Sequence, residues 1–282
     1  MSCQEKTYPS SRGDIAAKIW NSGASNRAIA LHGWLDNAAS FDGLAPLLPD
    51  LEIVAIDLPG HGFSFHRNAN EAYPFAEWIS CLREAFDALG WERAIWMGHS
   101  LGGAIASFYA ALFPEHVEKL WLLESMGPLA LTAEEAPERM KKYLEEQQKM
   151  RVAKTPVYRS VEDVVKLRRA VTSLLSTSAY TLMERSLKPV EGGYTWRSDP
   201  ALRLSTPVRM VPEQIHAYMR RIQAPTLLVR AENGIEYDRL DAKARIEAVA
   251  NLKVITIPGG HHVHLDHPER VAEVLKNELR TA

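Results

Sequence analysis

The chain has 282 residues, of which 46% are hydrophobic and 24% charged, a composition typical of globular proteins and not of disordered or fibrous chains. Its 33 Lys and Arg residues nearly balance 35 Asp and Glu residues, so the formal charge is -2 and nucleic acid is not an expected partner. Only two cysteines occur, Cys3 and Cys81, which argues against a disulfide framework or a cysteine metal clamp.

The sequence also lacks the apolar segments that direct proteins to membranes. The first residues contain no apolar core of a signal peptide, and no run of about 18 apolar residues occurs. We therefore expect a cytoplasmic protein without stable membrane insertion. Monomeric and homo-oligomeric states both remain open.

Short apolar runs alternate with helical patterns along the chain. In chain order we expect strands over residues 27–31, 51–57, 94–97, 119–123, 225–230 and 252–257. Helices are expected over residues 75–89, 102–113 and 268–279. This alternation predicts an α/β fold, in which a buried, mostly parallel sheet carries helices on both faces.

The alternation breaks between about residues 128 and 212, where charged helical stretches cover 134–151 and 161–169. We interpret 127–221 as a helical cap inserted into a core domain that consists of 1–126 and 222–282. Such a cap is expected over the carboxyl edge of the sheet, where α/β proteins bind ligands. Its larger side chains are candidates to line an apolar pocket: Tyr180, Met183, Tyr194 and Trp196.

A candidate nucleophile lies between the predicted strand 94–97 and helix 102–113. The sequence there is Gly98-His99-Ser100-Leu101-Gly102, which matches the G-x-S-x-G pattern in the strand-to-helix context that the pattern requires. Flanking glycines permit a cramped turn, and the helix N-terminus favours developing negative charge. The competing interpretation is a serine in a tight turn selected only for glycine geometry.

Two backbone N–H groups are candidates for an oxyanion hole. One belongs to Leu101, directly after Ser100, and the other to Trp34, which follows His32-Gly33 at the end of an earlier strand. Both are inferred from position only. Alternatively, Trp34 is an aromatic wall residue and His32 is a structural histidine.

A histidine-rich loop follows the last predicted strand. A neutral imidazole from this loop could act as general base for Ser100, and four histidines are candidates: His261, His262, His264 and His267. The run from His262 to His267 also spells H-x-H-x-D-H, which resembles the zinc motif of metallo-β-lactamases. Residues 268–282 supply none of the further His and Asp ligands that a two-metal site needs, so no metal is expected.

Together these motifs resemble the α/β-hydrolase superfamily, and they include Asp57-Leu58-Pro59-Gly60-His61-Gly62-Phe63-Ser64. The phrases HGWLDNAASFD, GGYTWRSDP and PGGHHVHLDHPE are most similar to the serine hydrolase-like group. The resemblance implies a mostly parallel eight-stranded sheet with an inserted helical cap, and a cofactor-independent triad in the order Ser, acid, His. It also implies that His261, the residue after Gly260, is the base, with His264 as the alternative.

The acid is where this sequence departs from the resemblance. Many relatives carry Asp shortly after the seventh strand, but here the position holds Gly234. Other members place the acid after the sixth strand, where this chain has Glu124. We therefore predict Glu124 as the acid, with Asp238 as the second candidate and Glu232 as the third. Asp57 is assigned a structural role.

The leading hypothesis is a serine hydrolase that cleaves a small ester-like acyl substrate through an acyl-enzyme. One alternative keeps the fold but changes the reaction, for instance to hydrolysis of a C–C bond. Another is a ligand-binding homologue that has lost turnover because its acid is displaced.

Overall fold

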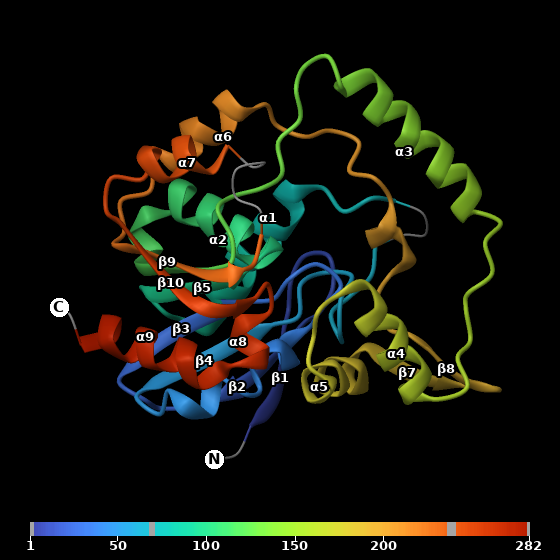
Figure 1. Ribbon diagram of the computed structural model, residues 1–282, viewed down its shortest axis with the longest axis horizontal. Helices are drawn as coiled ribbons and strands as arrows, with labels where there is room; N and C mark the ends of the chain where they lie inside the picture. The colour runs from blue at the N-terminus through green and yellow to red at the C-terminus, as the bar shows by residue number, and fades with distance from the viewer. Residues whose placement is uncertain (1–2, 68–70, 236–240, 281–282) are drawn as a thin grey trace.

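The computed structural model describes residues 3–67, 71–235 and 241–280 (Figure 1). Its centre is an eight-stranded sheet in the order β1-β2-β4-β3-β5-β6-β9-β10. The pairs β1–β2 and β2–β4 are antiparallel and all other pairs are parallel, which confirms the expected mostly parallel sheet. The strands are β1 (Gln4–Tyr8), β2 (Ile15–Trp20), β3 (Asn26–Leu31), β4 (Leu51–Ile56), β5 (Ala94–His99), β6 (Val117–Leu123), β9 (Thr226–Asn233) and β10 (Leu252–Gly260).

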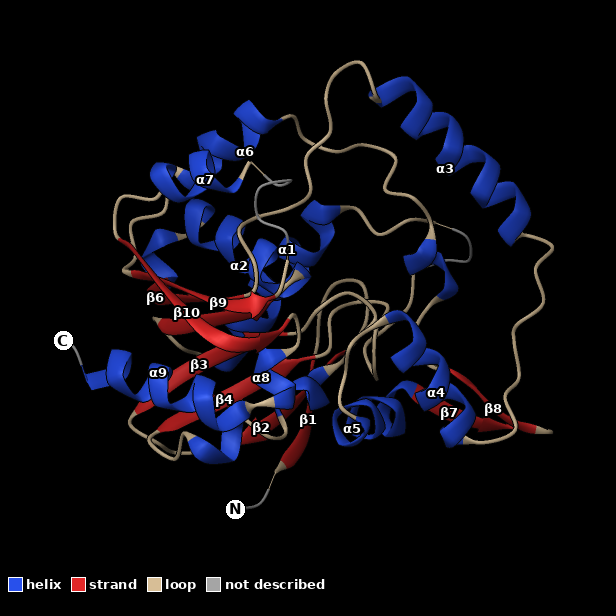
Figure 2. Cartoon of the chain, viewed as in Figure 1, coloured by secondary structure: helices blue, strands red, loops and turns tan. Residues whose placement is uncertain are grey.

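Helices cover both faces of the sheet (Figure 2). One face carries α1 (Phe75–Leu89), α2 (Leu101–Leu112), α6 (Pro212–Met219) and α7 (Ala242–Ala248). The other face carries α8 (Val263–Asp266), α9 (Pro268–Arg280) and the short 3-10 helices η1 (Ala38–Phe41) and η2 (Ala45–Leu47).

The two faces are buried in two separate apolar clusters. Ile29 and Leu31 of β3 pack into the cluster beneath α1 and α2, whereas Ala28 and Ala30 of the same strand pack into the cluster beneath α9. Successive side chains of a strand point to opposite faces, and here both faces are covered. This explains why the parallel strands appear in the sequence as continuous apolar runs.

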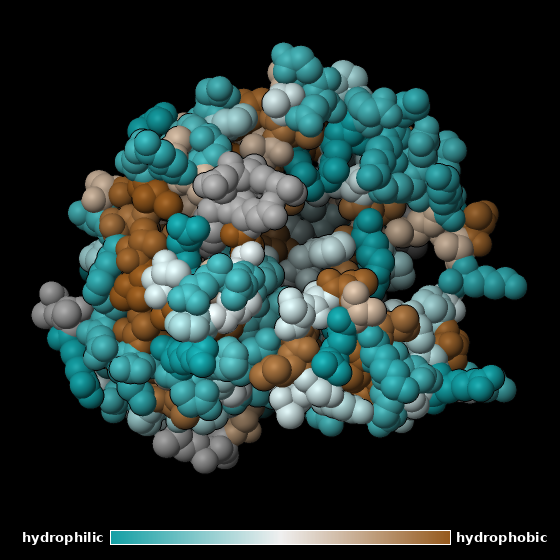
Figure 3. All heavy atoms as spheres, in the orientation of Figure 1, coloured by the Kyte–Doolittle hydropathy of each residue, from teal (hydrophilic) through white to brown (hydrophobic). Residues whose placement is uncertain are grey.

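The segment interpreted as a cap contains helices and one hairpin. Its elements before α6 are α3 (Ala136–Met150), α4 (Val161–Val171), α5 (Ser176–Ser186), the antiparallel pair β7 (Leu187–Val190) and β8 (Gly193–Trp196), and the 3-10 helix η4 (Pro200–Arg203). No residue of α3 is buried, and Figure 3 shows a mostly hydrophilic surface where Figure 1 places this helix. The last helix, α6, packs against α2 of the core.

Buried polar contacts join the segment to the sheet. Arg185 of α5 places Nη2 2.7 Å from Oδ2 of Asp57, whose side chain is completely buried after β4. Asp57 also accepts hydrogen bonds from the backbone N–H groups of Ala38 and Phe63 at 2.7 and 2.9 Å. These contacts support the structural role predicted for Asp57. Among the described residues, no helix has the length and apolar character needed to cross a membrane.

Candidate active site

Ser100 lies on a tight turn between β5 and α2. Its φ of 51° is in the left-handed region, which non-glycine residues adopt at an energetic cost, and such strain is typical of a nucleophile at a strand-to-helix turn. Gly102 allows this turn to approach β3, because a Cβ at position 102 would overlap the carbonyl group of Leu31. The turn is also held by Ser125, whose hydroxyl donates to the Ser100 carbonyl at 2.7 Å.

His261 connects Ser100 to a buried carboxylate. Its Nε2 lies 3.1 Å from Oγ of Ser100, and its Nδ1 lies 3.3 Å from Oε2 of Glu124. Because a carboxylate accepts a hydrogen bond from the Nδ1–H, the proton of the neutral ring is on Nδ1 and the Nε2 lone pair faces the serine hydroxyl. The structure thus brings the predicted nucleophile, base and first-choice acid together, from the ends of β5, β10 and β6.

Glu124 is fully buried, and the backbone fixes its carboxylate. Oε1 accepts a hydrogen bond from the Ala231 N–H at 2.6 Å, and Oε2 accepts one from the Ile235 N–H at 2.8 Å. The φ of Glu124 is 51°, so the residue adopts a strained conformation directly after β6. Both oxygens are therefore held in place while Oε2 faces His261.

Gly234 explains how the glutamate fits beneath the loop after β9. A Cβ at position 234 would overlap the Glu124 carboxylate. The glycine that replaces the usual aspartate of the motif therefore leaves the space that Glu124 occupies. Of the other candidate acids, Glu232 is exposed and Asp238 lies outside the described residues.

The two N–H groups predicted for an oxyanion hole are both without a hydrogen-bond acceptor in the described part of the chain. Leu101 is the first residue of α2, where backbone N–H groups have no partner within the helix. The turn that contains Trp34 is held by His61, whose Nε2 accepts from the Leu35 N–H at 3.2 Å. The Trp34 side chain is half exposed, and its indole donates to the Leu202 carbonyl at 3.0 Å.

His32 and His264 have structural partners. His32 is buried, and its two ring nitrogens contact the Gly33 carbonyl and the Leu58 N–H at 2.8 and 3.0 Å. Burial lowers the pKa of His32, which keeps this ring neutral. His264, the alternative base, is also buried, and its Nε2 lies 2.7 Å from the hydroxyl of Ser40 instead of facing Ser100.

Comparison with known proteins identifies the family. A model of the alpha/beta hydrolase fold family matches residues 29–268. The chain belongs to the alpha/beta hydrolase fold family.

Its relatives also confirm the similarity to serine hydrolase-like proteins. The chain is 36% identical over 286 residues to a probable serine hydrolase of Drosophila melanogaster. This match covers 96% of the present chain and 86% of the relative. It is 31% identical over 282 residues to a serine hydrolase-like protein of Danio rerio, covering 95% and 86% of the two chains. A crystal structure of a hypothetical protein from Pseudomonas aeruginosa matches with a TM-score of 0.92 at 35% identity, covering 98% and 99%. Family and relatives support hydrolase activity.

A second cluster lies behind His261 and holds its loop. His99 donates its Nε2 proton to the His261 carbonyl at 2.9 Å, and Nε2 of His262 lies 3.4 Å from Oδ2 of Asp36. Burial acts to raise the pKa of Asp36, but the contact with His262 and the charge of Arg168 outweigh it and keep this pKa below its usual value. The sequence did not predict the cluster of Asp36, His99 and His262, although His99 directly precedes Ser100 and His262 directly follows His261.

The cluster could in principle bind a cation. Ligand atoms of Asp36, His99 and His262 all lie within 4.8 Å of one another. Oδ1 of Asp36, however, already accepts from Nη2 of Arg168 at 2.6 Å, so an arginine of α4 balances the carboxylate charge. The residues of the H-x-H-x-D-H motif contact different partners: His264 contacts the Ser40 hydroxyl, and Asp266 accepts from the backbone N–H of residue 175. These two side chains are therefore not directed at one shared ligand.

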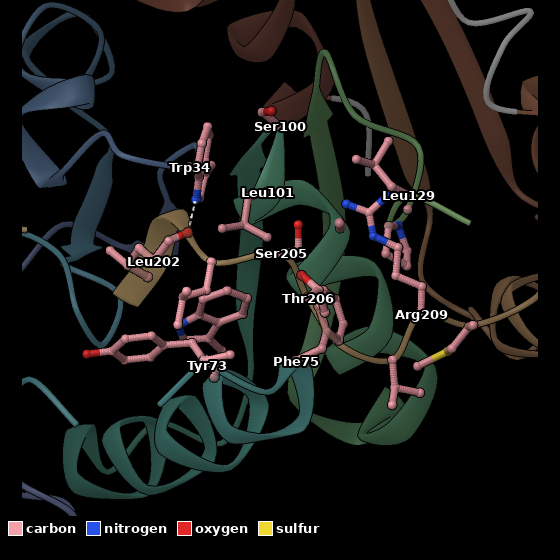
Figure 4. Close-up of a pocket in the computed structure, with 18 of the residues that line it drawn as sticks. Trp34, Tyr73, Phe75, Ser100, Leu101, Leu129, Leu202, Ser205, Thr206 and Arg209 are labelled. Carbon is pink, nitrogen blue, oxygen red and sulfur yellow. Dashed lines mark hydrogen bonds between the residues drawn. The ribbon is translucent and has the colours of Figure 1, made fainter. Parts of the chain in front are cut away.

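A pocket of about 500 Å³ opens beside Ser100 (Figure 4). Its walls come from the core, through Trp34, Phe75 and Trp78, and from residues 127–129, 201–206 and 208–210 of the inserted segment. The expected lining by Tyr180, Met183, Tyr194 and Trp196 is wrong. Tyr180 and Met183 of α5 and Tyr194 and Trp196 of β8 instead belong to a small apolar cluster, because α5 packs against both α4 and β7.

Proposed function

We propose that this hydrolase cleaves an ester-like acyl substrate, with Ser100 as nucleophile, His261 as general base and Glu124 as the acid that orients His261. The observation that carries the proposal is the continuous line of contacts from Glu124 through His261 to Ser100. A serine hydroxyl is weakly nucleophilic at neutral pH, and a neutral imidazole within hydrogen-bond distance activates it.

In the first half of the reaction, Oγ of Ser100 attacks the substrate carbonyl while its proton moves to Nε2 of His261. The N–H groups of Leu101 and Trp34 donate to the oxyanion that forms. The C–O bond to the leaving alcohol then breaks, and the alcohol takes the proton from His261.

In the second half, water attacks the acyl-enzyme and transfers a proton to His261. The ester bond to Ser100 breaks, the carboxylic acid leaves, and Ser100 regains its proton from His261. Throughout both halves the Glu124 carboxylate accepts a hydrogen bond from the Nδ1–H of His261, stays ionised and stabilises the imidazolium.

Two measurements test this proposal. The wild type should react with a fluorophosphonate probe and hydrolyse a short p-nitrophenyl ester, and Ser100→Ala should abolish both while unfolding at the same temperature. A folded wild type that neither labels nor turns over esters would support a ligand-binding homologue. Turnover of C–C substrates alone, dependent on Ser100, would support the alternative reaction on the same fold.

A further inference from the structure

The described lining of the pocket beside Ser100 carries positive charge and no acidic side chain. Three arginines line it: Arg139 of α3, Arg203 at the end of η4, and Arg209 shortly before α6. Within the described part of the chain, no lining residue is Asp or Glu. The rest of the lining is mainly apolar, so the positive charge is concentrated on these guanidinium groups.

The polar and ring contacts of Arg139 and Arg203 are with neutral groups. Nε of Arg139 donates to the Thr206 carbonyl at 3.0 Å, and the Arg203 guanidinium lies 5.4 Å from the ring centre of Trp196. In the described ranges none of the three forms an ion pair. Glu146, also on α3, is near enough for its charge to interact with that of Arg139, but within those ranges it forms no ion pair with Arg139, and its Oε2 accepts from the backbone N–H of residue 205 at 2.6 Å.

Arg209 is the best placed of the three to meet a ligand. It is half-buried, and Figure 4 shows its side chain running toward Leu129, on the side of the pocket across from Trp34. Burial, followed by the neighbouring charge of Arg139, lowers the pKa of Arg209, and no acidic side chain of the described residues pairs with it. Buried cations in proteins are normally paired, and a bound anion would complete the pair.

We propose that the pocket binds an acyl group with an anionic oxyacid at its far end, held by Arg209 and Arg139 while the ester carbonyl lies at Ser100. This inference rests on the proposed function. A guanidinium presents a planar set of donors that matches a carboxylate or a phosphate, whereas the apolar walls at Phe75 and Trp78 suit the chain between the two ends.

The test compares esters that differ only at the far end of the acyl chain. The probes are p-nitrophenyl hexanoate, the mono-p-nitrophenyl ester of adipic acid, and the p-nitrophenyl ester of 6-phosphonooxyhexanoic acid. We expect kcat/KM of the wild type to be at least about 10-fold higher for one anionic ester than for the hexanoate. The better anionic ester distinguishes a carboxylate from a phosphate ligand.

Arg209→Gln should lower kcat/KM for that anionic ester about 10- to 100-fold more than for the hexanoate, which is the range expected when a charged hydrogen-bond partner is lost. Most of this loss should appear as a higher KM. Arg209→Lys keeps the charge and should retain much of the preference. The matched control is Arg151→Gln, which removes the same charge from an exposed residue at the end of α3, outside the pocket lining, and should leave both rates unchanged. Equal losses on both esters, or a wild-type preference for the hexanoate, would overturn the proposal.

Binding separates this inference from the proposed function. Folded Ser100→Ala cannot hydrolyse esters by the proposed route, but it should still bind adipate in calorimetry, and Arg209→Gln in that background should weaken binding at least 10-fold. If the wild type hydrolyses none of the esters while adipate binds in this way, the proposed reaction fails and the anion site stands. If esters are hydrolysed but neither adipate nor the phosphorylated acid binds, the anion site fails.

Discussion

The most informative single substitution is Glu124→Gln, because it keeps the shape of the side chain and removes only its charge and one acceptor. Each carboxylate oxygen now accepts a backbone N–H, from Ala231 and from Ile235. A glutamine has one oxygen, so its NH₂ group must face one of these donors and leave that N–H without a partner. The expected loss of stability is about 1–3 kcal/mol.

The effect on turnover should be larger. If the glutamine oxygen stays near Ala231, its NH₂ group faces Nδ1 of His261 and favours the imidazole tautomer that is protonated on Nε2. That tautomer cannot accept the proton of Ser100. The corresponding change in a serine protease lowers kcat about 10⁴-fold, which corresponds to about 5 kcal/mol at 1.36 kcal/mol for each factor of ten.

The assay is hydrolysis of a short p-nitrophenyl ester by wild type and variants, each with a measured unfolding temperature. The control variants are Glu232→Gln, which alters an exposed carboxylate, and Asp238→Asn, which tests the second candidate acid. We expect Glu124→Gln to lower kcat about 10³- to 10⁴-fold and both controls to stay near the wild type. Loss of kcat in Asp238→Asn with Glu124→Gln within tenfold of the wild type would refute the reasoning.

Three further predictions follow from contacts and burial. Gly234→Ala should reduce ester turnover as strongly as Glu124→Gln, because the new methyl group overlaps the Glu124 carboxylate. The control Gly260→Ala, where a Cβ would lie 3.8 Å from the nearest atom, should stay close to the wild type. Equal turnover rates of the two glycine variants would contradict the packing argument. Arg185→Met leaves the Asp57 charge buried without its ion pair and should lower the free energy of unfolding by about 3–5 kcal/mol in urea titration, and a loss below 1 kcal/mol would contradict this. The free energy of unfolding should also fall with acidification. A histidine whose pKa is lowered by folding is neutral in the native state, whereas in the unfolded state it becomes protonated below a pKa of about 6.5. Below that pH, each such residue therefore lowers the free energy of unfolding by up to about 1.4 kcal/mol per pH unit. An unfolding temperature that is constant between pH 7.5 and 5 would refute this effect of burial on four histidines, His32, His61, His99 and His264.

The strands that the sequence reveals form the parallel part of the sheet. Five of the six predicted runs, β3, β4, β5, β6 and β9, are largely buried, and burial on both faces produces continuous apolar sequence. The sixth, β10, is apolar in sequence although most of its residues are at least partly exposed. β2 is buried but was not predicted, because Lys18 interrupts its short apolar run. β1 could not be recognised in this way, since four of its five residues are exposed and its sequence is polar. It is held by backbone pairing with β2, a contact that leaves little trace in side-chain type.

The candidate site was predictable where chemistry fixes the residue type. Ser100 and His261 occur in motifs whose glycines and loop positions have direct physical reasons, and the structure places them 3.1 Å apart. The arginine-lined pocket was not predictable. Arg139 and Arg209 come from separate parts of the inserted segment, and their residue type alone does not distinguish a pocket position from an exposed one.

The predicted acid position shows why a missing motif residue does not by itself indicate a missing acid. Gly234 and Glu124 are far apart in the sequence, and each alone suggests a different conclusion: the glycine suggests loss of the acid, and the glutamate suggests an ordinary residue at a strand end. In three dimensions they form one arrangement, because the space left by the absent side chain at 234 is occupied by the Glu124 carboxylate. The backbone N–H of Ile235 donates to that carboxylate, so the loop after β9 still contributes to the site. A chain that had simply lost its acid would have no reason to keep both the empty position and the buried charge that fills it, since an unpaired buried carboxylate is costly.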